Sequence, residues 1–208
     1  MRIAGSNGRT TQRALRKAAI ELISQHGYHG ISLRMLADHV GLQAGSLYNH
    51  IKSKQDLLFM LLRSIQEDLI RNAEENLDPI RGTLPRLCTF VNQHIDFHTA
   101  RKAEVFIGNM ELRSLTPENH AVMIGLRKKY EMMLREIVQA GIDECIFNVP
   151  EAKITSFAIL GMMNGVSNWY QPKGGFTIPE LQVRYTEMVL GLLHTSEDIR
   201  SRFLARQS

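Results

Sequence analysis

Cysteine, proline and aromatic residues are scarce in this chain of 208 residues. The only two cysteines, Cys88 and Cys145, stand far apart, which excludes a disulfide framework and a C-x-x-C pair and suits a reducing cytoplasm. Six prolines and 15 glycines are too few for a collagen-like or disordered chain. The first residues lack the apolar segment of a signal peptide, so we expect a cytoplasmic protein.

Catalytic motifs and strand patterns are also missing. We find no nucleophile elbow, no P-loop, no G-x-G-x-x-G and no His-Glu-x-x-His, so we expect neither an enzyme nor a cofactor. Residues 154–172 are uncharged and long enough to span a bilayer, but six of them are polar. A helix buried between its own domain and a second subunit is the better interpretation.

Positive charge is concentrated in the first quarter of the chain. Residues 1–54 contain eight bases and two acids, a net charge of +6, whereas the remaining residues sum to −2. This asymmetry indicates a polyanion or an anionic membrane as the partner of the amino-terminal quarter.

Apolar residues recur at helical spacing along most of the chain, which predicts an all-α protein of nine or ten helices. We expect a DNA-binding domain over residues 1–54 and a larger ligand-binding and dimerisation domain over residues 55–208. Ser32 and Ser53 are expected N-caps, and Gly27 and Gly41 expected helix ends. The expected helices cover residues 11–26, 33–40, 43–50, 54–76, 83–99, 103–114, 117–140, 151–170 and 178–193, and a charged helix can follow residue 196.

The most specific pattern lies at residues 32–51 and predicts a helix-turn-helix. Ala37 supplies the small residue needed where two helices cross closely, and Gly41, four positions later, tolerates the positive φ of the turn. Apolar residues flank both positions, namely Leu36, Val40, Leu42 and Leu47. A helical hairpin with a solvated basic face is the alternative, but the coincidence with the charged quarter favours DNA binding.

The second helix of this motif carries groups suited to the major groove. Ala44 and Gly45 are small enough for close approach, and Gln43 and Asn49 can bond bidentately to adenine. Phosphate contacts are expected from Tyr48, His50, Lys52 and Lys54, and backbone or groove-edge contacts from Ser32 and Arg34.

Residues 11–60 resemble the DNA-binding domain of the TetR family of bacterial transcriptional regulators. The resemblance is carried by Ala18-Ala19 with Leu22 and by residues 27–32, 45–50 and 52–58. It implies a homodimer that binds a palindromic operator, usually as a repressor, and that a small molecule in the larger domain releases. It also implies the DNA-binding residues Thr11, Ser32, Arg34, Gln43, Ala44, Gly45, Ser46, Tyr48, His50 and Lys54. The family varies at the position of Asn49, so that residue is a DNA-binding candidate on the chemistry of its amide alone.

A weaker resemblance, at residues 111–118, 127–131, 161–164 and 169–172, points to a TetR subgroup that includes regulators of fatty-acid, sterol or acyl-CoA catabolism. We therefore expect a largely apolar effector. Methionine and aromatic side chains would line its cavity, and the alternative is that they only pack in the core. The candidate ligand residues are Phe59, Leu62, Phe106, Met110, Met123, Tyr130, Met133, Phe157, Met163, Asn164 and Trp169. Arg127, Lys128 and Lys129 are candidates for CoA phosphates or for a solvated helix face.

The helices over residues 154–169 and 179–193 are expected to form a four-helix dimer interface. We expect close approach at Ser156, Ala158, Gly161 and Gly165, with Phe157, Leu160 and Leu190 filling the contact. His94 and His98 are spaced for a metal site, but no third ligand is evident, so no metal is expected. Two rival functions remain, a helical ligand-binding protein or enzyme with an incidental basic head and a membrane-surface protein.

Overall fold

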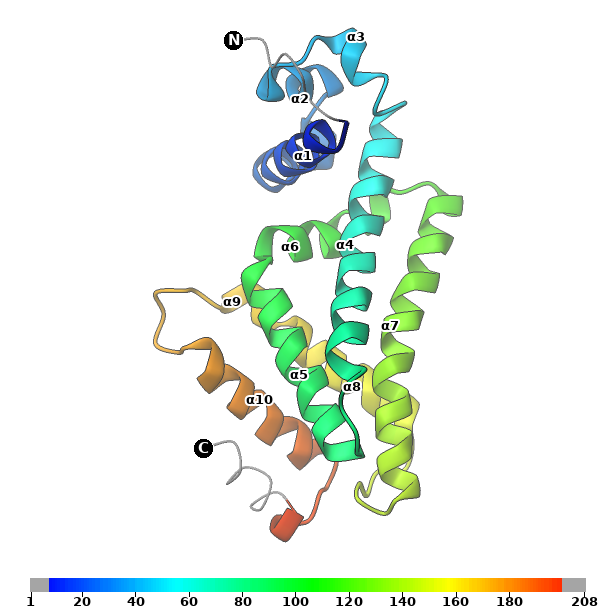
Figure 1. Ribbon diagram of the computed structural model, residues 1–208, viewed down its shortest axis with the longest axis vertical. Coiled ribbons are helices and arrows are strands. Elements are labelled where there is room, and N and C mark those ends of the chain that lie inside the picture. The colour runs from blue at the N-terminus through cyan, green and yellow to red at the C-terminus, as the bar shows by residue number, and fades with distance from the viewer. Residues whose placement is uncertain (1–7, 200–208) are drawn as a thin grey trace. The chain divides into compact units, whose positions relative to one another are not determined.

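Every regular element of the described chain is helical. The computed structural model describes residues 8–199, and its elements run in the order shown in Figure 1. They are α1 (Gly8–Gly30), α2 (Leu33–Val40), α3 (Ala44–Leu47), α4 (Lys54–Leu77), α5 (Thr83–Ala100), α6 (Lys102–Met110), the 3-10 helix η1 (Leu112–Ser114), α7 (Pro117–Asp143), α8 (Ala152–Asn164), α9 (Val166–Trp169) and α10 (Ile178–Leu192). The all-α prediction is confirmed. Most of the charged helix suggested after residue 196 lies outside the described residues.

Local sequence signals set most helix ends. The Ser32 hydroxyl accepts a hydrogen bond from the Met35 backbone N–H at 3.1 Å, as an N-cap does. Gly41 ends α2 in the left-handed region, with φ 69° and ψ 28°. Thr177 and Glu180 form a reciprocal capping box at the start of α10. These ends agree with the sequence-based expectations.

Several expected helices differ in extent. The second motif helix, expected over 43–50, is only the four residues of α3, and residues 103–114 are divided between α6 and η1. The expected helix 151–170 is divided into α8 and α9 at Gly165. Gly141 neither ends α7 nor leaves space, because a Cβ there would lie 2.0 Å from the Phe147 ring. The ring of Phe147 packs directly on the helix backbone at this glycine.

Contacts divide the chain into two compact units. The first, here called the head unit, comprises Met1–Glu67 and Ala103–Leu126, and the second, the body unit, comprises Asp68–Lys102 and Arg127–Ser208. This division differs from the expected boundary at residues 54/55, because α4 is continuous and α6 with the start of α7 joins the amino-terminal helices by contacts. The functional boundary at 54/55 therefore stays a prediction.

Each unit has its own apolar core. In the head unit, α1 packs on α2 and α2 on α3, around fully buried Leu36, Leu47 and Ile51. In the body unit, α5 is the central helix: it packs against α10, α9 and α8, and eleven of its residues are buried (Figure 1). Among residues 8–199, no helix combines the length and apolar character needed to cross a bilayer.

Candidate nucleic-acid interface

The α2–α3 motif is held by a small buried core and a tight turn. Ala37 is only 1% exposed, as expected for a close helix crossing. Its carbonyl accepts a hydrogen bond from the Leu42 N–H at 2.9 Å, across the left-handed turn at Gly41. Because Leu36 and Leu47 are fully buried at 0% exposure, α3 cannot rotate without exposing apolar surface, at about 1.5–3 kcal/mol per side chain. The motif thus presents one fixed face of α3.

The opposite side of α3 is polar and open. Gln43, Gly45, Ser46 and Asn49 are all exposed, and Tyr48 is 58% exposed. Gln43 stands at the N-cap position of α3 without a side-chain cap bond, so its amide is not used to end the helix. Small residues, an amide and hydroxyls on one exposed helix end are the groups that read base edges and phosphates in the major groove.

The flanking candidates divide into exposed and engaged side chains. Arg34 is exposed and His50 is half-buried, while the Ser32 hydroxyl already caps α2. Lys54 is half-buried, and its Nζ donates to the His29 carbonyl at 3.2 Å. Thr11 is the exception among the predicted DNA contacts: it is 8% exposed, because it lies on the same buried face of α1 as Leu15 and Ala18. Ala44 opens α3, as the motif requires.

The predicted ligand residues are distributed over both units. Phe59, Leu62, Phe106, Met110 and Met123 belong to the head unit, and the other six to the body unit. Four of the eleven are about half exposed, namely Phe106 at 48%, Met110 at 46%, Phe157 at 51% and Trp169 at 49%. Their assignment to a ligand pocket stays a prediction, because helical spacing does not distinguish an inward apolar residue from an outward one. Leu62, Met123, Tyr130 and Met163 are buried, Phe59 and Met133 are half-buried and Asn164 is exposed.

A buried polar cluster lies in the body unit, where α5 faces α7. The Gln93 Nε2 donates to the Tyr130 hydroxyl at 2.9 Å, and His94 Nδ1 lies 2.9 Å from the same hydroxyl. The rings of His94 and His98 stack with centroids 3.7 Å apart. Among the described residues, His94 Nε2 and Gln93 Oε1 are buried without a hydrogen-bond partner. These two atoms can serve a neutral polar group of a bound molecule.

Burial keeps this cluster uncharged. Loss of solvent lowers the pKa of His94 well below its ordinary value, and the neighbouring His98 acts in the same direction. Burial lowers the pKa of His98 to about 4, against the opposing effect of its hydrogen bonds to the His94 carbonyl and to Asn164. In the described part of the chain, no group of three or more His, Cys, Asp or Glu side chains is placed to hold a metal ion. Gln93 was missed by the sequence analysis, since nothing in its local pattern sets it apart.

The basic run on α7 is only partly available. Lys129 pairs with Glu74 at 2.7 Å, and burial lowers the pKa of Arg127. Lys128 is exposed. The run therefore behaves mainly as a paired and solvated helix face.

The outer face of α8 exposes large apolar side chains, and α10 exposes Val183 and Met188 beside Arg184 and Glu187. Ile154 is 66% exposed and Phe157 51%, with exposed Ala158 and Gly161 on the same face of α8. Ser156 and Leu190, expected in the dimer contact, are instead 0% exposed within the single subunit. The helical phase explains the difference, because residues 155, 156 and 159 face inward when residues 154, 157, 158 and 161 face outward.

Comparison with known proteins identifies the fold and the motif. The family model "Bacterial regulatory proteins, tetR family" matches residues 15–61, and "Tetracyclin repressor-like, C-terminal domain" matches residues 82–193, more than half of the chain. The repressor KstR2 of Rhodococcus jostii is 28% identical over 193 residues, which cover 90% of this chain and 92% of KstR2.

Two solved structures share the fold over nearly the whole chain. A tetR-family regulatory protein from Rhodococcus RHA1 superposes with a TM-score of 0.83 at 24% identity, covering 89% of this chain and 97% of the other. AibR, solved in complex with isovaleryl coenzyme A and operator DNA, superposes with a TM-score of 0.76 at 25% identity, covering 87% and 96%. Both the reading motif and the larger part of the chain thus match one family, and this protein belongs to the TetR family of DNA-binding transcriptional regulators.

Proposed function

We propose that this protein is a homodimeric repressor that binds a palindromic operator and is released by an apolar or acyl-CoA-type ligand. The observation that carries the proposal is the exposed polar end of α3, fixed over the buried Leu36 and Leu47. That arrangement gives a rigid, small-ended helix with Gln43 and Ser46 available to base edges. A regulator of this kind acts at the nucleoid in the bacterial cytoplasm.

The homodimer is supported by the outer faces of α8 and α10. Both helices pack one side on α5, and on the other side they expose Ile154, Phe157, Val183 and Met188. Large apolar side chains grouped on exposed helix faces mark sites of association. Two copies related by a two-fold axis carry two reading motifs, and a palindromic operator matches that symmetry, with half-sites roughly 34–36 Å apart.

The ligand is supported by the buried cluster of Gln93, His94 and Tyr130. A polar cluster inside an apolar unit is costly unless every group is paired, and a neutral hydrogen-bonding group on a ligand would complete it. Gln93 also lines a groove of about 560 Å³ formed by residues of α4 and α5 within the body unit. The likeness to AibR, solved with isovaleryl coenzyme A, favours a thioester, whose carbonyl oxygen can accept a hydrogen bond from His94 Nε2–H. Gln93 Oε1 is an acceptor and needs an N–H or O–H donor elsewhere on the ligand. Release follows only if the ligand binds the DNA-free conformation more tightly.

The operator is tested with DNA from immediately upstream of the coding region. Fluorescence anisotropy should show binding to the labelled upstream DNA, and an unlabelled scrambled duplex of equal length should not displace that DNA. Gln43→Ala should cost about 1–3 kcal/mol on the operator and relax base preference at its contact. Gln171→Ala, an exposed glutamine in the loop before α10, is the matched control and should bind as wild type. Equal affinity for operator and scrambled DNA would contradict a sequence-specific regulator.

The effector is tested on the same protein–DNA complex. Isovaleryl-CoA and a series of longer acyl-CoA thioesters should lower the anisotropy and raise the melting temperature of the free protein, by about 2.7 kcal/mol of stabilisation at 100 times the Kd. Free coenzyme A is the control for the apolar acyl group. If no thioester shifts either signal, the acyl-CoA class is wrong and DNA binding stands on its own test.

A further inference from the structure

A kink near the end of α1 creates a need for an outside hydrogen-bond acceptor. Gly27 has φ 69° and ψ 162° inside α1, a conformation that glycine reaches readily and other residues do not. Such a break displaces the following N–H groups from regular helical partners. The Tyr28 backbone N–H instead donates to Oε1 of Glu111 at 3.0 Å, and Glu111 lies 83 positions further along the chain.

Glu111 is itself held firmly in place. Its N–H continues the α6 pattern by donating to the Ile107 carbonyl at 2.9 Å, and its second oxygen, Oε2, accepts from the Ser114 hydroxyl at 2.9 Å. The Ser114 carbonyl in turn accepts from Gln55 Nε2, on the first turn of α4, at 2.6 Å. All of these residues belong to the head unit. One carboxylate therefore joins the end of α1 to η1, and η1 is bonded to the start of α4.

The Tyr28–His29 end of α1 is also the platform for Lys54. The Lys54 Nζ lies 4.6 Å above the centre of the Tyr28 ring and donates to the His29 carbonyl at 3.2 Å. An ammonium has three N–H donors, so the bond to His29 leaves donors for a DNA phosphate. The position of the Tyr28–His29 end thus decides where the Lys54 charge is held.

We propose that Glu111 is a positioning residue for operator binding, which clamps the kinked end of α1 and so fixes the ammonium of Lys54 for its phosphate. The inference rests on the proposed phosphate contact of Lys54. Without the carboxylate, the Tyr28 N–H loses its acceptor and the platform under Lys54 loses its tie to η1. Sequence distance hides this link, because Glu111 lies in a segment assigned by sequence to the ligand-binding domain.

A second contact keeps the rest of α1 in place when Glu111 is changed. Arg16 pairs with Glu104 of α6 at 2.7 Å, with the Glu104 side chain 16% exposed. Leu15 and Ala19 beside it are buried. The loss of Glu111 should therefore loosen the end of α1 rather than unfold the head unit.

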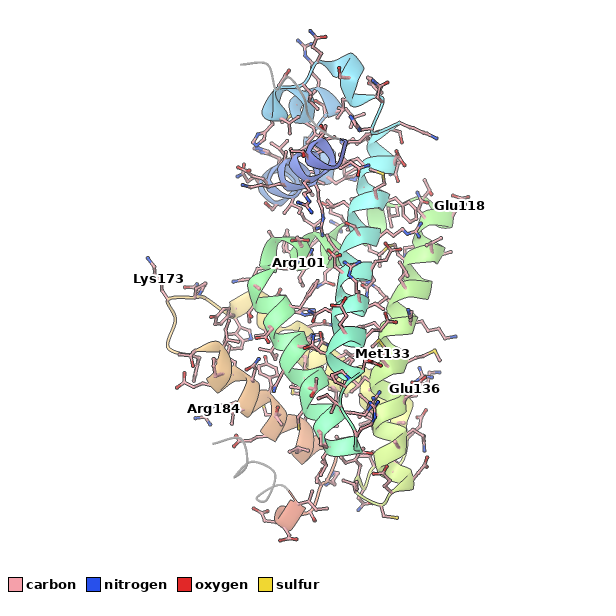
Figure 2. The ribbon with its side chains drawn as sticks, viewed as in Figure 1. Arg101, Glu118, Met133, Glu136, Lys173 and Arg184 are labelled. Carbon is pink, nitrogen blue, oxygen red and sulfur yellow. The ribbon has the colours of Figure 1, made fainter. Side chains whose placement is uncertain are left out.

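The experiment compares four variants of the full chain by anisotropy on the upstream DNA, over a series of salt concentrations. Glu111→Ala should raise the operator Kd about ten-fold, and Glu111→Asp, which shortens the side chain with little risk to folding, should give part of that loss. Glu111→Gln keeps an oxygen for the Tyr28 N–H and should restore near wild-type binding. Glu118→Ala removes the same charge from an exposed position at the start of α7 and should cause no loss (Figure 2).

The distinguishing readouts are the salt slope and a double-mutant cycle with Lys54→Ala. Glu111→Ala should lower the slope of log K against log salt by about 0.9 for each phosphate that the protein no longer neutralises, and should add nothing in the Lys54→Ala background. The role of Glu111 is overturned if Lys54→Ala lowers the salt slope while Glu111→Ala and Glu111→Asp keep the wild-type Kd and slope. It is also overturned if the effects of Glu111→Ala and Lys54→Ala on operator binding are additive. An unchanged salt slope for Lys54→Ala contradicts the proposed phosphate contact and, with it, the role of Glu111. The proposed function is tested separately, by the affinity of the wild-type protein for the operator.

Discussion

Single buried residues in the body unit make its stability depend on pH. His98 is 4% exposed, and burial lowers its pKa to about 4 from an ordinary 6.5. Between these values the unfolded chain binds more protons than the folded protein, so acidification favours unfolding. His94, whose pKa burial also lowers, acts in the same direction.

We therefore expect the free energy of unfolding to fall as the pH is lowered from about 6.5 towards 4, by about 1.4 kcal/mol for each pKa unit. His98→Asn, which retains a donor for the His94 carbonyl, should flatten this dependence. His26→Asn changes an exposed histidine of α1 and should not. Urea unfolding at several pH values gives the measurement, and parallel curves for wild type and His98→Asn would contradict the assignment.

The local sequence pattern could not predict which polar residues are buried. The spacing of His94 and His98 could not show that their rings stack or that Tyr130 lies against His94. Whether a side chain at helical spacing is a ligand, a core residue or a surface residue depends on its neighbours from other helices. For the same reason, helical spacing did not show that Phe157 and Trp169 are about half exposed.

At the scale of elements, the turn between α2 and α3 is the place where a substitution has the clearest conformational cost. Gly41 has φ 69°, and a Cβ there would meet nothing within 4 Å. A substitution is therefore opposed by backbone conformation alone and not by crowding.

We expect Gly41→Ala to destabilise the protein by about 1–2 kcal/mol and to weaken operator binding, because the turn sets the direction of α3. Gly125→Ala is the matched control, since Gly125 is an exposed glycine in helical α7 with open space around its Cβ. That change should stabilise by up to about 1 kcal/mol through helix propensity. Denaturant unfolding measures both, and equal midpoints for the two variants would refute the conformational cost.

At the scale of the whole molecule, the proposed function depends on association, because one motif would read only half of a palindromic operator. The surface proposed for association contains Phe157, 51% exposed on α8. The Arg184 side chain, on α10, is exposed and points outward from the body unit (Figure 2). An apolar contact of this kind tolerates no unpaired carboxylate.

Phe157→Glu should raise the dimer dissociation constant by about 100-fold or more, since an unpaired buried charge costs several kcal/mol. Sedimentation equilibrium should then show the single-chain mass, and operator affinity should fall with it. Met132→Glu places the same charge at a methionine 40% exposed on α7 and should leave the dimer intact. A dimeric Phe157→Glu protein would exclude this face as the interface.

The helical class, the caps at Ser32, Gly41 and Thr177, and the helix-turn-helix could all be predicted from the order of residues alone. These features depend on residues within about one helical turn of one another, so local chemistry is sufficient to specify them. The four-residue length of α3, the burial of His94 and His98, the exposure of Phe157 and the bond from Tyr28 to Glu111 emerged only in the folded chain. Each depends on which distant segments pack together, and the periodicity of a helix indicates that one face is buried but not which segment covers it.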